Sequence, residues 1–225
     1  MMLVLNNKSS FSFDEFNNYI NKLSEIKNKS SIILCPSLCY IPLCLNLGIP
    51  IGSQDVSSSL SSFYTGEVTA RQLKSLGVSY SIVGHGDRCE SVDVVKSKLR
   101  VLLDNDIIPI LCIGEQKENS ELNEIKKELL DRISVSLEDL TYQEKEKIMF
   151  AYEPIWAING NTKLDISNTL EVIMYIKELF PNNKVLYGGG VNIDNYYSLS
   201  NFSKLDGLLL GRMGNDIDII SNIIE

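Results

Sequence analysis

The stretch YSIVGHGDRCESVDVVKSKLRVLLDNDIIPILCIG, residues 80–114, contains one complete unit of strand, helix and strand. Residues 80–84 and 107–114 are short runs rich in apolar and β-branched side chains, which is typical of buried strands. Between them, residues 92–105 carry apolar side chains at three- and four-residue steps, the period of an amphipathic helix. A helix between two such strands predicts a parallel strand pair joined by a crossover helix.

The same alternation extends over the whole chain. Further strand-like runs lie at residues 2–5, 31–35, 49–54, 147–153, 184–189 and 206–211. Helical periodicity predicts additional helices at residues 13–26, 67–77, 123–137, 166–180 and 217–225. We therefore expect one α/β domain over residues 1–225, a (β/α)8 barrel. Its loops must be trimmed, because the chain is shorter than the roughly 250 residues typical of that fold.

A doubly wound open sheet is the structural alternative. That fold places a glycine-rich GxGxxG turn after its first strand, whereas this chain has LNNKSSF at residues 5–11. The barrel is therefore favoured. A long serine-rich segment, residues 56–67, follows the third expected strand, and loops of this length in compact domains are usually functional.

Charge and cysteine content argue against several classes of function. The 225 residues carry a net charge of -8, whereas a nucleic-acid binder or a membrane-surface binder needs a cationic face. The five cysteines lack the paired spacing of zinc or redox sites, so we expect reduced, packed thiols and no metal. No run approaches the roughly 18 to 20 apolar residues of a membrane span. We expect a cytoplasmic protein that uses no cofactor.

Polar residues and glycines gather where the expected strands end. Barrels carry their active sites at the carboxyl ends of the strands, so these positions share one mouth. His85, the only histidine, follows the strand at 80–84, and Glu153 ends the strand at 147–153. A base and an electrophile on separate strand ends suggest proton transfer next to a carbonyl group. The other strand-end positions are Asn6, Lys8, Gly188, Gly189, Gly190 and Gly211.

Each of these residues also has an ordinary structural explanation. A strand-end glutamate often caps a helix, a lone histidine is usually a surface or core residue, and most lysines are solvated. Context favours chemistry here, because Pro154 and Trp156 after Glu153 resemble the hinge of a mobile lid. The glycines after the last two strands lie where barrels bind phosphate, so a small anionic substrate fits the pattern.

Eight short strings spread over the chain resemble the triosephosphate isomerase family, in the family's order. They are LNNK at 5–8, GSQDVS at 52–57, FYTGEVTA at 63–70, IVGHGDR at 82–88, PILCIGE at 109–115, AYEPIWAI at 151–158, YGGGV at 187–191 and DGLLLG at 206–211. The resemblance implies an isomerase in which Glu153 moves a proton between adjacent carbons while His85 polarises the carbonyl. Asn6 and Lys8 would stabilise the enediolate and the phosphate.

The resemblance also implies a phosphate-binding site and a partner subunit. Backbone amides of two strand ends and of the lid would hold the phosphate, at Asn159, Gly160, Gly189, Gly190, Gly211 and Arg212. The long third loop would dock into a second subunit, with Thr65 reaching the partner's site, which implies a homodimer. Asp87, Arg88 and Glu67 would support the site through ion pairs, and plain surface charge is the alternative for Arg88 and Glu67.

Several positions depart from the family pattern. Tryptophan is usual at Asn7, serine at Gly86 and Gly190, glutamate at Asp87 and glycine at Arg212, and the loop after Arg88 is shorter. The leading hypothesis is interconversion of dihydroxyacetone phosphate and D-glyceraldehyde 3-phosphate through an enediolate. The lid tip reads AINGNTK at residues 157–163, where the family has a Gly-Thr-Gly-Lys pattern. An isomerase of a four-carbon ketose phosphate is one alternative, which this lid tip and Arg212 would suit. A non-catalytic paralogue that binds a phosphorylated metabolite is the other, although it would need neither Glu153 nor His85.

Overall fold

All eight strands expected from the sequence form one sheet in which every strand pair is parallel. In the computed structural model, which describes residues 1–59, 63–118, 121–158 and 165–224, the sheet order is β2-β1-β8-β7-β6-β5-β4-β3. The strands are β1 Met2–Asn6, β2 Ile32–Cys35, β3 Gly52–Ser53, β4 Tyr80–Val83, β5 Ile108–Ile113, β6 Met149–Tyr152, β7 Val185–Tyr187 and β8 Gly207–Leu210. The expected run at 49–54 pairs as a strand over only two residues.

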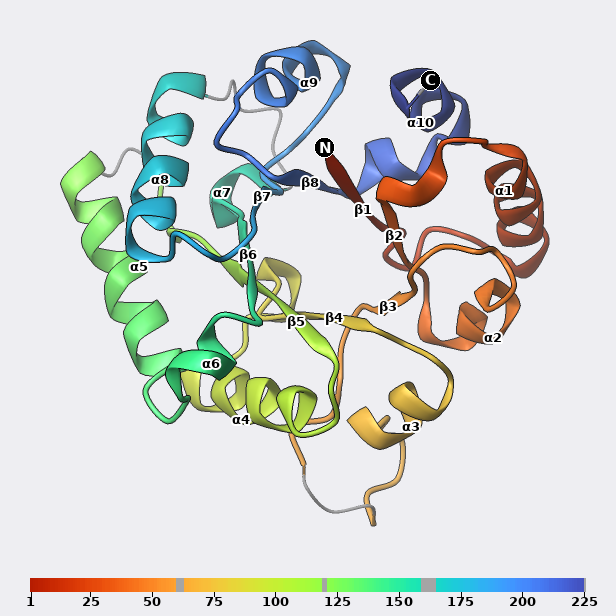
Figure 1. Ribbon diagram of the computed structural model, residues 1–225, viewed down its shortest axis with the longest axis horizontal. Coiled ribbons are helices and arrows are strands. Elements are labelled where there is room, and N and C mark those ends of the chain that lie inside the picture. Colours follow the sequence, from red (N-terminus) through yellow and green to blue (C-terminus); the bar gives the residue numbers. More distant parts are fainter. Residues whose placement is uncertain (60–62, 119–120, 159–164, 225) are drawn as a thin grey trace.

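The sheet curls into a nearly closed ring with helices around it (Figure 1). Its two end strands, β2 and β3, approach each other through a parallel bridge between Leu34 and Ile51. The backbone amide of Leu34 donates to the carbonyl oxygen of Pro50 at 3.0 Å. This contact between the ends of the strand order confirms the (β/α)8 barrel and rules out the open sheet.

Ten α-helices connect and cover the strands in the described residues. They are α1 Phe13–Glu25, α2 Ile41–Cys44, α3 Ala70–Ser75, α4 Val92–Leu103, α5 Leu122–Ser136, α6 Tyr142–Lys145, α7 Ile155–Ile158, α8 Ile166–Leu179, α9 Ile193–Ser200 and α10 Ile217–Ile224. Short 3-10 helices lie at η1 Lys29–Ser31, η2 Leu38–Tyr40, η3 Gly86–Arg88 and η4 Arg212–Asn215. The expected helices are confirmed as α1, α3, α4, α5, α8 and α10. None of the described helices is long and apolar enough to cross a membrane.

The helix starts follow local capping chemistry. At the start of α1, the backbone amide of Ser12 donates to the Glu15 carboxylate at 2.8 Å, which completes a capping box. The helix then buries Phe16, Tyr19, Ile20 and Leu23 against the barrel. Helix α9 has no strong apolar pattern, yet the Asn192 side chain accepts from the amides of Asp194 and Asn195 and nucleates it.

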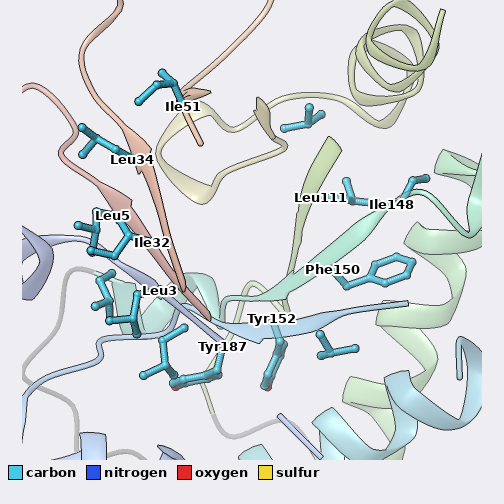
Figure 2. Close-up of a cluster of buried hydrophobic side chains, with 14 of the residues drawn as sticks. Leu3, Leu5, Ile32, Leu34, Ile51, Leu111, Ile148, Phe150, Tyr152 and Tyr187 are labelled. Atoms are coloured by element: carbon cyan, nitrogen blue, oxygen red, sulfur yellow. The ribbon is translucent and has the colours of Figure 1, made fainter. Parts of the chain in front are cut away.

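The barrel core has two layers because strand side chains alternate between its two faces. The outer layer lies between strands and helices, and Figure 2 shows its strand side, including Leu3, Leu5, Ile32, Leu34, Ile51, Leu111, Ile148, Phe150, Tyr152 and Tyr187. The inner layer fills the barrel with Val4, Ile33, Cys35, Ile82, Ile110, Cys112, Met149, Ala151, Leu186 and Leu209. All five cysteines are free thiols; Cys35, Cys44 and Cys112 are buried. The packed interior holds the carboxyl ends of the strands in fixed positions.

Candidate active site

The histidine and the glutamate face each other across the mouth of the barrel. His85 follows β4, Glu153 follows β6, and the His85 Nε2 atom lies 3.5 Å from Glu153 Oε1. The backbone amide of Asp87 donates to His85 Nδ1 at 3.1 Å, so Nδ1 is an acceptor and the ring proton is on Nε2. Burial lowers the pKa of His85. The ring is therefore a neutral imidazole that points its N–H towards the mouth.

Glu153 is a buried carboxylate that is more basic than an exposed glutamate. It is 3 % exposed, and its Oε2 atom makes no hydrogen bond with any described residue. Burial raises the pKa of this carboxyl to about 8, although hydrogen bonding by Cys112 and the positive charge of Lys8 lower it. Gly188 leaves the space that the carboxylate occupies, since a Cβ there would lie 2.7 Å from Glu153 Oε1. A carboxyl group with this pKa is suited to act as a general base near neutral pH.

Lys8 supplies positive charge from a left-handed backbone position, with a φ of 50°. Asn6 holds this conformation by accepting the Lys8 amide at 3.1 Å, while the Lys8 carbonyl accepts from Ser37 Oγ and Gln54 Nε2, both at 2.8 Å. The Lys8 Nζ atom lies 2.7 Å from Asp87 Oδ2. The short carboxylate of Asp87 therefore still reaches Lys8, despite its departure from the family pattern.

The segment after Glu153 is anchored by a carboxylate that the sequence analysis missed. Glu115 is 1 % exposed and accepts hydrogen bonds from the Tyr152 hydroxyl at 3.0 Å and from Trp156 Nε1 at 2.8 Å. Its carbonyl accepts from the amide of Ile155 at 3.0 Å. The available signal was its position directly after β5, a strand end like that of Glu153. Asn159 and Gly160, expected at the lid tip, lie outside the described residues.

The glycines after β7 and β8 present backbone donors at the same mouth. The N–H groups of Gly189, Gly211 and Arg212 donate to no acceptor within the described part of the chain. Gly190 has a φ of 65°, a conformation that glycine adopts readily. A Cβ on Gly211 would lie 3.6 Å from Lys8 Cε, so the lysine chain passes close to this loop. The Arg212 side chain is exposed. Backbone donors beside a lysine form a suitable anion site.

Arg88 joins a cluster of ion pairs behind the histidine. Its Nη2 atom lies 2.6 Å from Asp55 Oδ2, and its Nε atom lies 3.5 Å from Glu90 Oε1. Lys98, which is 3 % exposed, pairs with both of these carboxylates. The cluster ties the loop after β3 to the loop after β4.

Glu67 lines the same surface hollow as Arg88. Within the described residues it forms no ion pair, and it is exposed, as is Thr65. The supporting role of Glu67 and the partner contact of Thr65 remain predictions.

A neutral histidine opposite a buried basic glutamate, beside a lysine and backbone amides that donate to no described residue, is the arrangement expected of an enzyme that moves protons on a small anionic molecule. The family model for triosephosphate isomerase matches residues 1–225. The chain is 34% identical over 236 residues to a triosephosphate isomerase of Wolbachia sp. subsp. Brugia malayi, covering 100% of the chain and 96% of that protein. It is 32% identical over 245 residues to one of Orientia tsutsugamushi strain Boryong, with the same coverage. The chain belongs to the triosephosphate isomerase family, and it is an isomerase.

Proposed function

We propose that this chain interconverts dihydroxyacetone phosphate and D-glyceraldehyde 3-phosphate by a proton shuttle between Glu153 and His85. The observation that carries the proposal is the 3.5 Å approach of His85 Nε2 to Glu153 Oε1 at the barrel mouth. A substrate seated there has a base at one carbon and an N–H donor at the neighbouring carbonyl oxygen. The names of the relatives, which are triosephosphate isomerases, support the same substrate pair.

The reaction is a balanced isomerisation. The Glu153 carboxylate removes a proton from C1 of dihydroxyacetone phosphate, the C1–H electrons form a C1–C2 double bond, and the carbonyl electrons move to O2. The His85 Nε2–H group hydrogen-bonds to the developing oxyanion and relays a proton between O1 and O2. Glu153 then returns its proton to C2, which gives the aldehyde at C1 and restores both side chains.

Lys8 and the strand-end amides supply the electrostatics of the proposal. The Lys8 ammonium and the Asn6 side chain, both at the end of β1, would stabilise the enediolate. Backbone amides at Gly189, Gly211 and Arg212 would hold the phosphate, and the Gly190 amide, which donates to the Gly188 carbonyl oxygen at 3.2 Å, would have to leave that acceptor to join them. Fixed donors in a site that excludes water stabilise charge better than water does, because they need no reorganisation.

Isotope exchange tests this function directly. Conversion of dihydroxyacetone phosphate in D₂O is expected to place deuterium at C2 of the aldehyde, because the proton on Glu153 exchanges with solvent during the lifetime of the enediolate. A reaction without enzyme serves as the control. Aldehyde that contains only protium would contradict the proposed exchange of the Glu153 proton with solvent, and protium retained in the Glu153→Gln variant at parental rate would refute the shuttle.

The pH profile should carry the signature of the buried base. Glu153 acts only when ionised, and its pKa is about 8, so kcat/KM, which reports the ionisation of the free enzyme, should fall as pH decreases through about 8. His85 stays neutral over this range because its pKa is lowered. The second ionisation of the substrate phosphate, at about pH 6, would appear as a separate step in the profile. A kcat/KM profile that stays flat down to about pH 5 would contradict the prediction.

We also propose a cytoplasmic homodimer. The amide of Ser57 donates to the Val68 carbonyl at 2.8 Å and closes the base of the long third loop. Beyond that base, Phe63 is 93% exposed and Tyr64 is 62% exposed, and aromatic surface of this kind favours a partner. Exposed free thiols fit a reducing compartment.

Light scattering should give a dimer mass, and a Phe63→Ser, Tyr64→Ser variant should give a monomer mass.

A further inference from the structure

A partly buried amide bridge connects the loop that carries Lys8 to the loop that carries Gly211 and Arg212. The Asn7 Nδ2 atom donates to Asn215 Oδ1 at 2.9 Å, and Asn215 Nδ2 donates to Ser10 Oγ at 2.9 Å. Asn215 is the last residue of η4, which begins directly after Gly211. The bridge therefore joins the carboxyl end of β1 to that of β8 through side chains that are 208 positions apart in sequence.

Packing alone does not explain an asparagine at position 7. Asn7 is 1 % exposed, and its Oδ1 atom has no hydrogen-bond partner among the described residues. A buried acceptor without a partner destabilises a protein, and an apolar side chain would avoid that cost. What the amide adds is an N–H group that donates to Asn215 and also reaches the Tyr19 hydroxyl.

The loop after β8 is held from a second direction as well. The Tyr19 hydroxyl, from α1, donates to the carbonyl oxygen of Gly214 at 2.8 Å. Tyr19 therefore fixes the height of η4 above the barrel, while Asn7 and Ser10 fix its position relative to the β1 loop. The position of η4 relative to the β1 loop matters for the site, because a Cβ atom added to Gly211 would lie only 3.6 Å from Lys8 Cε.

We propose that Asn7 and Asn215 are positioning residues that set the spacing between the Lys8 ammonium and the backbone amides of Gly211 and Arg212, and thereby the affinity for the substrate phosphate. The proposal rests on the proposed function, because it assumes that these two loops grip one phosphate. Neither asparagine touches the substrate. Their effect passes through the two loops that they join.

The test combines steady-state kinetics with binding of inorganic phosphate to the whole protein. Asn7→Ala and Asn215→Ala should each raise KM, and weaken inorganic phosphate binding, by about five- to tenfold, the range expected for one hydrogen bond. Their kcat should change much less, because ground-state and transition-state binding weaken together. The double variant should lose no more than the single variants, because both remove the same bridge.

Asn183→Ala provides the matched control. Asn183 is 4% exposed and donates from Nδ2 to the carbonyls of Lys145 and Ile148, both at 2.7 Å, near the amino end of β7 and so at the opposite end of the barrel. This variant should lose stability and leave KM and phosphate binding unchanged. If Asn7→Ala does not fold, Asn215→Ala decides the question, because Asn215 is partly exposed.

The outcomes separate the bridge from the function. Loss of stability with unchanged KM and phosphate binding in the Asn7 and Asn215 variants would reduce the bridge to a structural contact and overturn the proposal. Phosphate binding by a parent protein that lacks isomerase activity would refute the proposed function, while phosphate titration of the variants would still test the bridge. An active parent that binds no inorganic phosphate would keep the proposed function, and unchanged KM values in the variants would then overturn the bridge.

Discussion

Glu153→Gln is expected to lower kcat by about 10²- to 10⁴-fold, the usual contribution of a positioned general base. Glutamine keeps the shape of the side chain but cannot accept the C1 proton. Because Glu153 Oε2 has no hydrogen-bond partner in the described residues, the change breaks no hydrogen bond of that atom. Steady-state assays in both directions measure the loss. Activity within tenfold of the parent would show that Glu153 is not the base.

Thermal stability separates this chemical loss from misfolding. Folding raises the Glu153 pKa from an ordinary value of 4.5 to about 8, so this group contributes stability below about pH 4.5 that is lost as pH rises to about 8. Glutamine does not ionise, so the variant should gain stability relative to the parent as pH rises through this window. Between about pH 5 and about pH 9, the melting temperature of the variant should therefore rise relative to that of the parent. An inactive variant that is less stable at every pH would point to structural damage instead.

Lys8→Met is expected to lower kcat/KM by about 10²- to 10³-fold, as does removal of other groups that stabilise an oxyanion. Methionine fills a similar volume without charge. The loss has two sources, because the ammonium would bind the anionic substrate and also lies 2.7 Å from Asp87. Without Lys8, Asp87 would act on His85 uncompensated, and the pKa values of His85 and Glu153 would both rise. The acid limb of the pH profile should therefore move to higher pH.

Lys22→Met is the matched control for Lys8. Lys22 pairs with Asp218 at 3.1 Å on the exposed surface, a contact that contributes little to stability. The variant removes the same charge from the net total but none from the barrel mouth, so its kinetics should match the parent. Equal losses in both variants would mean that overall charge, and not the site, controls substrate capture.

Much of this architecture could be predicted from local sequence patterns. Short runs of apolar and β-branched residues located all the strands, helical periodicity located six of the ten described α-helices, and the strand-end positions of His85 and Glu153 predicted their approach. Helix α9 was missed because the Asn192 cap starts it without a strong apolar stripe. The role of Glu115 was missed because it depends on Trp156 and Tyr152, which come from a different strand end.

Contacts between side chains that are far apart in the sequence could not be predicted from local sequence patterns. The bridge from Asn7 to Asn215 joins the two ends of the chain, and it exists only because β1 and β8 are neighbours in the closed barrel. Likewise, the ion pair of Asp87 with Lys8 joins the loop after β4 to the loop after β1, which the barrel brings to one mouth. Each is a consequence of barrel closure and required the folded structure.

The most direct test of the account is kcat/KM on D-glyceraldehyde 3-phosphate compared with erythrulose phosphates. The proposed site predicts a triose value of about 10⁷ to 10⁸ M⁻¹s⁻¹, near the diffusional range, and a much lower value on the four-carbon substrates. Preference for a tetrulose phosphate would contradict the assigned substrate. Inactivity on both would contradict the proton shuttle itself and favour a phosphometabolite-binding protein.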